Sequence, residues 1–477
     1  MRHGARTWHG PSNRHGADLV SDLRPLIIGA GPAGIRAAEA LVKAGIRPIV
    51  IDEAPIGGGQ IYRQRLVPDE RTPRDLYGSE AGKATALHET FAQLRDRIDY
   101  LPQALAWNIR GKAADVVIGG RARRIDFSHV ILATGATDRV LPFQGWTVPG
   151  VFTLGGAQIA LKSQGCAIGE QVIFLGSGPL LYLVAWQYVK AGARVVAVLD
   201  TAPFRAKFHL LRGLSSQPGV VVRGFRYATE LMARGVRVRF GITPVRVEGE
   251  TRVTGLVWRE ENHQEHRLSC DAVGYGLALR SETQLADLAG CRFVFDERDR
   301  AWRPESDDAG RTSVSGVYIA GDGAGIAGAD AAELAGERAG LALLDDVGFP
   351  VDRARIDILE RKLAAIKRFR DILEKAFPFP ETWANSLADD LMLCRCEEIT
   401  VGQARAAAHE QGVTEINRLK ALTRVGMGRC QGRVCGSAAA EILASASGKT
   451  LEGVGRLRSQ PPIKPLPLDT MAEGEAA

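Results

Sequence analysis

The fold is decided by the stretch Leu26-Ile27-Ile28-Gly29-Ala30-Gly31-Pro32-Ala33-Gly34. Its apolar start predicts a buried strand, and a GxGxxG turn follows at the point where a helix begins. Gly29 permits the tight turn, Gly31 lets the backbone approach a pyrophosphate, and Gly34 lets the helix pack closely on the strand. The stretch therefore predicts a dinucleotide-binding unit, with the phosphates at the positive end of the helix.

The residues that follow supply the context that this motif needs. Pro32 and Ala33 open the predicted helix, and a second apolar strand follows over residues 49–51. Asp52 comes directly after that strand, where a carboxylate accepts hydrogen bonds from a ribose 2′-OH. Glu53 is the alternative for that role. Strand, turn, helix, second strand and acid agree, so we predict a Rossmann unit here.

A second unit of the same kind begins near residue 172. An apolar strand leads into Gly176-Ser177-Gly178-Pro179-Leu180-Leu181, and a further strand ends at Asp200. Leu181 stands where close packing of helix on strand calls for Gly or Ala. We therefore expect a Rossmann domain in which NAD binding is doubtful, through Gly176 and Gly178 if it occurs, and Asp200 would then favour an unphosphorylated ribose. The uncharged run 172–189 is read as strand, turn and helix, so no transmembrane helix is predicted.

Two later strand ends resemble markers of the flavoproteins with two dinucleotide-binding domains. They are the runs 130–135, ending in Thr134-Gly135, and 317–322, ending in Gly321-Asp322. The resemblance implies FAD, a chain crossing into the second domain near the first marker, and a hold by Asp322 on the ribityl or phosphate region. The glycine-rich run 57–60, with Gly59 and Gln60, is a flexible turn or a backbone segment that lies close to the flavin ring.

Four of the seven cysteines gather near one end of the chain, as Cys394-Arg395-Cys396 and, after 33 residues, Cys430 and Cys435. Clustered thiols without a signal peptide indicate a metal site in a reducing compartment. Four thiolates are what a [2Fe–2S] cluster needs. The predicted helices near 400–412, 415–423 and from 437 place both pairs in loops at helix ends. Arginines and glycines are expected to stabilise the anionic cluster: Arg395, Arg424, Arg429, Arg433, Gly426, Gly428, Gly432 and Gly436.

Structural zinc is the main alternative for these four thiols. Zinc sites generally space both cysteine pairs by two to four residues, whereas one residue separates Cys394 from Cys396. This spacing resembles the bacterioferritin-associated-ferredoxin-like [2Fe–2S] domain, which favours the cluster. Cys166, Cys270 and Cys291 are isolated and are expected to be small buried hydrophobes. A dithiol mechanism is disfavoured because residues 57–64 contain no cysteine.

The predicted fold class is α/β, with two Rossmann-like domains, the second inserted in the first, and a small, mostly helical C-terminal [2Fe–2S] domain. The expected parts are a flexible N-terminal extension (1–24), an FAD-binding domain (25–144 and 281–345), a second nucleotide-binding domain (145–280), a helical connector (346–390), the cluster domain (391–448) and a C-terminal tail (449–477). Two to four domains are ordinary for 477 residues.

The charge and the start of the chain narrow the function. The net charge is +6 and the pI about 9.0, yet no basic run is interleaved with aromatic residues, so nucleic-acid binding is not expected. A basic surface that faces an anionic cofactor or an acidic partner is the simpler interpretation. Residues 1–24 contain no apolar stretch of signal-peptide length. We expect a cytoplasmic protein, with peripheral association at the inner membrane left open.

Nearly the whole chain, from about Leu26 to Pro467, resembles the larger flavin subunit of the opine oxidase, hydroxyproline or proline dehydrogenase and hydrogen cyanide synthase group. The resemblance is carried by the runs 51–55, 58–64, 145–151, 176–181 and 461–465 and by the four clustered cysteines. It implies a partner β subunit that binds its own FAD and oxidises an amino or imino acid, and leaves room for a small γ subunit. It also implies FMN at the subunit interface in some relatives, and electron transfer through the cluster to a respiratory acceptor.

Two other functions compete with this electron-transferring role. The two Rossmann units would suit a self-sufficient NAD(P)H-dependent reductase of the cluster, if a nucleotide binds despite Leu181. A scaffold protein with a vestigial flavin fold is the non-enzymatic alternative, and the intact Gly29, Gly31, Gly34, Asp52 and Asp322 argue against it. No His, Asp or Glu is predicted as a catalytic acid or base, and His88 and His129 are read as structural or surface residues.

Overall fold

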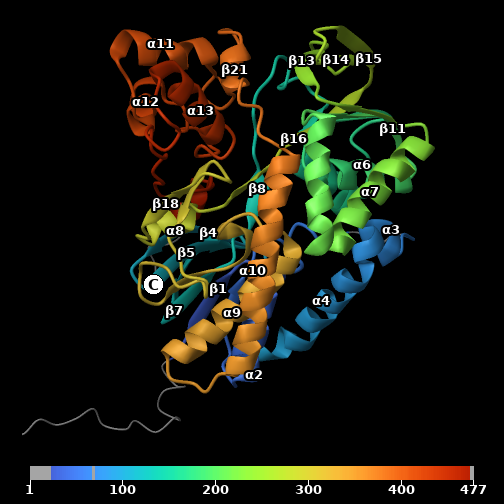
Figure 1. Cartoon of the computed structure of the whole chain (residues 1–477). Helices are drawn as coiled ribbons and strands as arrows, with labels where there is room; N and C mark the ends of the chain where they lie inside the picture. The colour runs from blue at the N-terminus through green and yellow to red at the C-terminus, as the bar shows by residue number, and fades with distance from the viewer. Residues whose placement is uncertain (1–22, 67–69, 473–477) are drawn as a thin grey trace, which may run out of the picture.

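The computed structural model (Figure 1) describes residues 23–66 and 70–472. The predicted N-terminal extension therefore lies almost wholly outside the described residues. The chain forms three bodies: two sheet-containing domains and a group of helices at the C-terminal end of the chain. None of the described helices is long and apolar enough to cross a bilayer.

The first domain is built on a parallel sheet in the order β20-β7-β1-β2-β3. Its strands are β1 (Pro25–Ile28), β2 (Ile49–Ile51), β3 (Asp99–Leu101), β7 (His129–Leu132) and β20 (Val317–Ile319). Val317 pairs with Val130, and Leu26 pairs with both Val130 and Ile49. Strands almost 300 residues apart in sequence thus share one sheet, and the second domain is inserted between β7 and β20.

Helices and a smaller sheet complete this domain. Helix α2 (Pro32–Lys43) packs along α9 (Ala329–Asp346), and α4 (Ala81–Leu94) also packs against α2. An antiparallel sheet contains β4 (Ala104–Arg110), β5 (Ala113–Ile118) and β6 (Arg121–Asp126). Further short elements here include α3 (Pro73–Tyr77), α8 (Gln284–Leu288), β18 (Phe293–Asp296) and β19 (Ala301–Pro304).

The second domain repeats the Rossmann plan with the sheet order β12-β11-β10-β16-β9. Its strands are β9 (Val151–Thr153), β10 (Gln171–Ser177), β11 (Arg194–Asp200), β12 (Arg237–Phe240) and β16 (Ala272–Leu277). The helices are α5 (Leu154–Ile159), α6 (Pro179–Lys190), the 3₁₀ helix η4 (Phe204–Ser215) and α7 (Pro218–Ala233), and a small sheet holds β13 (Thr243–Glu248), β14 (Gly255–Arg259) and β15 (Glu265–Ser269). The two chain crossings between the domains pair as antiparallel strands, β8 (Ala136–Asp138) and β17 (Leu279–Ser281). The expected strand, turn and helix over 172–189 is confirmed.

A long helix, α10 (Arg353–Ala376), connects the second half of the first domain to the C-terminal domain. The Asp352 side chain caps it by accepting from the Arg355 N–H, and it ends at Phe377 before Pro378, which cannot continue a helix. It packs on α9 of the first domain and on η4 of the second. One helix thereby braces both Rossmann domains (Figure 1).

The C-terminal domain contains a two-stranded ribbon, β21 (Met392–Cys394) and β22 (Ile399–Thr400), and three helices, α11 (Val401–Gln411), α12 (Ile416–Thr423) and α13 (Gly436–Ser447). The predicted capping box is present, because Thr400 and Gln403 cap each other's backbone N–H groups, and Gly412 ends α11 in the left-handed region. Its core is continuous with that of the second domain through Trp146 and Trp383. The predicted α/β fold with a mostly helical C-terminal domain is confirmed.

Candidate functional site

The glycine-rich turn after β1 leaves no room for side chains. Gly29 has φ +110°, and a Cβ there would lie 2.3 Å from the Ala133 carbonyl oxygen. A Cβ on Gly34 would lie 1.8 Å from the Gly29 carbonyl oxygen. Both positions therefore need glycine for the close approach of α2 to β1 and β7, as the sequence predicts.

The loop of residues 57–60 lies directly on this turn. The Gly58 N–H donates to the Ala30 carbonyl, and a Cβ on Gly59 would lie 2.9 Å from the Cα of Gly31. Gln60 accepts a hydrogen bond from Arg63 at 2.8 Å. The two glycine-rich segments are thus in direct backbone contact, and Gly31 and Gly59 both line the cavity described next, where the absence of side chains leaves room for a cofactor.

A cavity of about 1900 Å³ opens between the N-termini of α2 and α9 and extends toward the cysteines. The predicted FAD residues that line it are Gly29, Gly31, Pro32, Ala33, Asp52, Glu53, Gly59, Gln60, Thr134, Gly135, Gly321 and Asp322. Gly34 lies behind the wall, where it serves packing. Two helix N-termini place positive dipole ends and free N–H groups at the cavity, so the residues present fit a dinucleotide such as FAD.

The two acids after β2 differ in their surroundings. The Asp52 carboxylate accepts from the Ala30 N–H at 2.5 Å and from the Ala54 N–H at 2.7 Å. Burial raises the pKa of Asp52, and the two amides oppose that shift. Glu53 is more exposed and forms an ion pair with Lys464. A carboxylate has about four acceptor positions, so Asp52 retains capacity for a ribose hydroxyl and stays our candidate.

Lys464 is a cavity residue that sequence reasoning missed. It reaches the cavity because the tail crosses the first domain: the Ile463 N–H donates to the Trp107 carbonyl at 3.1 Å, and Arg433 donates to the Ile463 carbonyl. Burial lowers the pKa of Lys464 to about 8, and the Asp52 carboxylate opposes that shift. The Pro-rich run around Ile463 was the only available signal, and it did not show where the tail lies.

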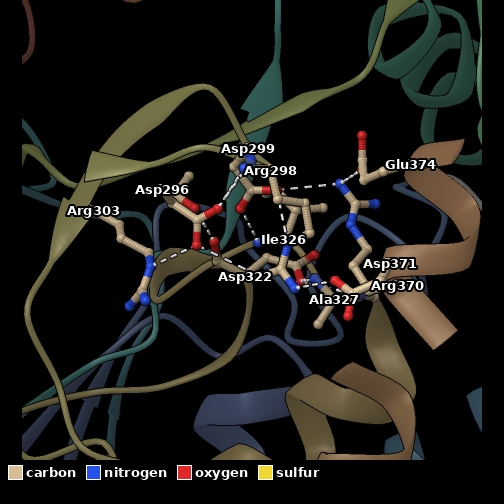
Figure 2. A network of polar contacts seen from close by, with 12 residues as sticks. Asp296, Arg298, Asp299, Arg303, Asp322, Ile326, Ala327, Arg370, Asp371 and Glu374 are labelled. Carbon is tan, nitrogen blue, oxygen red and sulfur yellow. Dashed lines mark hydrogen bonds and ion pairs between the residues drawn. The ribbon is translucent and has the colours of Figure 1, made fainter. Parts of the chain in front are cut away.

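Asp322 organises the loop at the start of α9. Its carboxylate accepts from the N–H groups of Ala327 and Gly328, at 2.8 and 2.9 Å. Burial raises the pKa of Asp322 against the effect of these amides. In Figure 2 its side chain lies beside Ala327, at the centre of a larger polar network. Asp322 therefore shapes a loop that lines the cavity, and the cofactor contact implied by the resemblance stays a prediction.

The same network ties this loop to α10 (Figure 2). Asp299 accepts from the Ile326 N–H at 3.1 Å and pairs with Arg370 of α10 at 3.2 Å. Arg370 also pairs with Glu374 at 2.5 Å, one helical turn further along. Asp299 is buried, so its charge depends on these partners. The connector helix thereby positions residues 326–328 at the cavity.

Asp138 is a second residue that the sequence did not single out. It ends β8 and lines the cavity beside Gly155 and Gln158. Its carboxylate accepts from the Gly155 N–H at 3.1 Å. Burial raises the pKa of Asp138, against hydrogen bonds from Thr153 and Gly155. A partly buried carboxyl group in a cavity wall is a candidate functional group, and it has no sequence motif of its own.

The four clustered cysteines lie at the other end of the cavity. Cys394 and Cys435 are buried, whereas Cys396 and Cys430 are partly exposed and line the cavity with Arg395, Arg429 and Arg433. The thiol of Cys435 contacts those of Cys394 and Cys430, and Cys396 contacts Cys430. In residues 23–66 and 70–472, no group of three or more His, Cys, Asp or Glu is arranged so that it could hold a metal ion. Structural support for a shared four-thiol site comes instead from the contacts between the thiols.

Backbone N–H groups face these sulfurs, as the glycine pattern predicts. Hydrogen bonds lower the pKa of Cys394 to about 6. The largest contribution comes from the thiol of Cys435, and the amides of Gly426, Glu397 and Cys396 add to it. A Cβ on Gly428 would lie 2.3 Å from the Cβ of Cys396. These amides favour the thiolate of Cys394, and thiolates are the ligands of iron–sulfur clusters. The pKa of Cys435 is raised instead, first by its hydrogen bonds to Cys394 and Cys430, and burial raises the pKa of Cys396.

Arg424 is largely exposed and pairs at 2.7 Å with Glu397, which follows Cys396 in the chain. The expectation that Cys166 is buried needs correction. Cys166 is exposed rather than buried, because it follows the end of a helical segment at Gln164. Cys270 and Cys291 are buried in hydrophobic clusters, as expected of small apolar residues.

Hydrogen bonds and one ion pair connect the two ends of the cavity. Thr134 donates to the backbone carbonyl of Glu282 at 2.6 Å, and the Glu282 carboxylate accepts from Arg433 at 2.8 Å. Gln284 donates to the Gln431 carbonyl at 2.9 Å. The predicted flavin residues and the cysteine loop are therefore held together by a partly buried ion pair, which sequence reasoning could not have found because about 150 residues separate its members.

The acid at the end of the second strand in the second nucleotide unit is buried in the protein interior. Asp200 is fully buried, and its carboxylate accepts from the Tyr182 hydroxyl at 2.6 Å and pairs with Lys207 of η4 at 2.8 Å. Lys207 in turn donates to the Ala376 carbonyl at the end of α10. Asp200 thus makes internal contacts that the sequence did not predict, and its role at a ribose, conditional on nucleotide binding, stays a prediction. Gly176 and Gly178 lie outside the walls of the large cavity.

Comparison with known proteins places this architecture in a class. The pyridine nucleotide-disulphide oxidoreductase family matches residues 24–339, and the BFD-like [2Fe–2S] binding domain matches residues 392–445. The chain belongs to the pyridine nucleotide-disulphide oxidoreductase family and carries a BFD-like domain at its C-terminal end. It is an oxidoreductase that binds FAD and a [2Fe–2S] cluster.

Within that class the chain is similar along its whole length to one group. It is 37% identical to the A subunit of opine oxidase from Agrobacterium tumefaciens (strain Ach5), over 95% of this chain and 92% of that protein. It is 36% identical to the corresponding opine oxidase protein of Rhizobium meliloti, over 95% and 89%, and 33% identical to the HcnB subunit of hydrogen cyanide synthase from Pseudomonas aeruginosa, over 94% and 97%. The resemblance stated from the sequence is confirmed, and the chain belongs to the family of these subunits.

The fold also matches a solved structure, L-proline dehydrogenase from P. horikoshii. The TM-score is 0.67 at 23% identity, over 94% of this chain and 79% of that chain. At this identity the likeness concerns the fold. It extends over all three bodies of the chain, including the C-terminal domain.

Proposed function

We propose that this chain is the electron-transferring subunit of a multi-subunit amine dehydrogenase. Its substrate class is an opine, a proline or hydroxyproline, or a glycine-type amino acid, which a separate FAD-containing β subunit oxidises. A small γ subunit is a further candidate member of the complex. The names of the relatives, which are subunits of opine oxidase and hydrogen cyanide synthase, support this assignment. FMN at the subunit interface and a respiratory acceptor belong to the same proposal.

The observation that supports this proposal most directly is that one cavity contains both the flavin residues and the cysteine loop. Gly29, Thr134 and Asp322 line one part of it, and Cys396 and Cys430 line another. FAD and the cluster, when bound, supply a two-electron and a one-electron carrier. The chain's own residues bind and orient these groups. Gly29 and Gly59 let the backbone approach a bound cofactor closely, and the ion pair Glu282–Arg433 holds the flavin residues and the cysteine loop together.

The second domain supports the choice of an electron source other than NADH. Asp200 is enclosed by Tyr182 and Lys207, and Leu181 is fully buried where a dinucleotide site would use Gly or Ala. A self-sufficient NAD(P)H-dependent reductase would need a ribose ligand and a phosphate seat at these positions. We propose that the site does not serve NADH and that a partner subunit supplies the electrons, in the cytoplasm or at the inner membrane surface.

The test compares the isolated chain with the complex purified from its native cells. We expect amine-dependent reduction of a dye by the complex, with opines and with proline-type imino acids assayed in parallel, and none by the isolated chain carrying FAD and iron. Amine-dependent dye reduction by the isolated chain at the rate of the complex would contradict the proposal. Flavin and iron contents of both samples serve as the control for loss of cofactor.

A further inference from the structure

A cation that the sequence did not single out lies between the predicted flavin residues and the cysteine loop. Arg280 belongs to β17, one of the two chain crossings between the Rossmann domains. Its Nε donates to the Thr137 hydroxyl at 3.1 Å, on β8, the strand that follows Thr134 and Gly135. Its guanidinium also pairs with the Glu282 carboxylate at 3.7 Å. Arg280 is therefore held from the flavin side of the cavity.

Glu282 connects this cation to the cysteine loop. Its carboxylate accepts from Arg433 at 2.8 Å, and the backbone N–H of Arg433 donates to the Cys430 carbonyl at 3.1 Å. We call Arg280, Glu282 and Arg433 the arginine–glutamate triad. Its three side chains are between 10% and 18% exposed. Two cations and one anion thus give the triad a net positive charge that water screens only weakly.

The charge of Arg280 reaches the sulfurs of the cysteine loop. Burial lowers the pKa of Arg280, and Glu282 opposes this shift, whereas Arg433 adds to it. Cys430 and Cys435 oppose the shift as well, which places their sulfurs within electrostatic reach of the guanidinium. An arginine side chain stays protonated in proteins. Arg280 therefore presents a fixed positive charge to two of the four clustered cysteines.

The other arginines near the sulfurs are placed differently. Arg395, Arg424 and Arg429 are exposed, so water and salt screen their charges. Arg433 contacts Glu282 at 2.8 Å, whereas Arg280 stays at 3.7 Å from the same carboxylate. In this set, Arg280 is the partly buried cation whose charge is least offset by a close anionic partner.

Fixed charges beside an iron–sulfur cluster act on its reduction. A [2Fe–2S] cluster with four thiolate ligands is an anion and becomes more negative when it accepts an electron. A nearby cation therefore stabilises the reduced state more than the oxidised state, and a nearby anion has the opposite effect. Net charge and burial around a cluster are among the quantities by which a protein sets its reduction potential.

We propose that Arg280 raises the reduction potential of the cluster and that Glu282 lowers it. Both are then positioning residues for electron transfer through this chain, since they act on the cluster without binding it. The inference rests on the cluster and goes beyond the proposed amine-dehydrogenase function. The opposite signs identify a charge effect, because loosening of the site would not depend on the sign of the charge that is removed.

The experiment is an anaerobic redox titration of the full-length, FAD- and iron-loaded chain, in which electron paramagnetic resonance measures the reduced cluster at controlled potentials. We expect Arg280→Gln to lower the equilibrium constant for one-electron reduction of the cluster about tenfold, and Glu282→Gln to raise it about tenfold. Each change corresponds to a shift of about 59 mV. Arg280→Lys keeps the charge and should return the potential close to that of the wild type.

Two matched controls remove the same charges from an exposed ion pair. Arg353→Gln and Asp345→Asn break the pair between α9 and α10, and α9 lies toward the opposite end of the molecule from α11, α12 and α13 (Figure 1). Neither control should move the cluster potential, because solvent and salt screen these charges. Iron content, flavin content and Tm show that each variant is folded and loaded. Glu282→Gln and Arg280→Lys still test the sign and the charge if Arg280→Gln loses its cluster.

Three outcomes would overturn the proposal. The first is an unchanged cluster potential in Glu282→Gln and in a loaded Arg280→Gln. The second is a shift of the potential in the same direction in both variants, which would indicate a change of packing. The third is a shift in Arg280→Lys as large as that in Arg280→Gln, which would show that the shape of the side chain matters and its charge does not. No amine or partner protein is present, so the result does not depend on whether the proposed dehydrogenase function is right.

Discussion

Single residues decide whether the nucleotide turn can form. Gly29 has both a positive φ and a carbonyl oxygen, that of Ala133, at 2.3 Å from the position of a Cβ. Gly82, in α4, has no atom within 4 Å of that position. The same substitution at the two glycines therefore isolates the steric requirement of the turn from the general effect of removing a glycine.

We expect Gly29→Ala to lose most of its FAD and about 2 kcal/mol or more of the free energy of unfolding. Gly82→Ala should keep its FAD and gain about 0.4–1 kcal/mol, because the unfolded chain loses entropy. Flavin content after gel filtration and urea unfolding measure both effects. Full flavin retention by Gly29→Ala would show that the turn tolerates a side chain.

Lys162 is a buried lysine whose charge has a measurable cost. It is 1% exposed and donates to the Ile61 carbonyl at 2.9 Å, and burial lowers its pKa to about 7. An unfolded lysine titrates near about 10.4. Between pH 7 and about 10 the unfolded state therefore binds one more proton than the folded state, so the stability of the wild type rises with pH over this range. Below pH 7 the full cost of burying the charged lysine is present.

Lys162→Met removes this pH-dependent contribution, so its stability relative to the wild type should fall by about 2–3 kcal/mol between pH 7 and pH 9. Urea unfolding of both proteins at the two pH values checks this. Lys362→Met, at an exposed position of α10, should show no such dependence. A stability difference for Lys162→Met that is independent of pH would mean that Lys162 keeps its proton in the folded protein.

At the level of elements, α10 joins both Rossmann domains to the cluster domain. Arg370 holds the buried Asp299, which in turn holds the loop at residue 326. Arg353 in the same helix forms an exposed pair with Asp345. Buried and exposed ion pairs differ strongly in the cost of removing one partner, so the two arginines form a matched comparison.

Arg370→Gln is expected to cost about 3 kcal/mol of stability and to speed FAD release, because Asp299 loses a partner beside the loop that lines the cavity. Arg353→Gln should cost less than about 1 kcal/mol and leave FAD release unchanged. Urea unfolding and the rate at which each loaded protein loses FAD on dilution measure these effects. Equal effects of the two substitutions would contradict a positioning role for α10.

The sequence predicted the strands, turns and helices of this site better than the contacts between them. The strand, turn and helix at residues 26–43 follow from local pattern, and so do the cap at Thr400 and the position of Cys394. The internal pairing of Asp200 was not predicted, because its partner Lys207 belongs to a 3₁₀ helix that the sequence pattern did not indicate. The contacts of Lys464 and of the pair Glu282–Arg433 join segments more than 140 residues apart, and a local pattern holds no information on such pairs.

At the scale of the whole molecule, the two cofactor regions should be separable by mutation. Cys430→Ser removes a cluster ligand without touching the glycine-rich turn, so iron should fall to a small fraction of the wild-type content while FAD remains. Cys166→Ser, at an exposed cysteine outside the cluster domain, should change neither. Iron and flavin assays on the purified proteins decide this, and full iron retention by Cys430→Ser would remove that residue from the ligand set.

The source of the electrons distinguishes a subunit of an amine dehydrogenase from an NADH-driven reductase. It can be determined from the visible spectrum of the anaerobic, FAD- and iron-loaded chain during a titration with NADH, followed by dithionite. We predict that NADH leaves the flavin and cluster absorption unchanged and that dithionite then bleaches both. Prompt bleaching by NADH would contradict delivery of electrons by a partner protein, and would show that the second domain binds a nucleotide despite Leu181 and the enclosed Asp200.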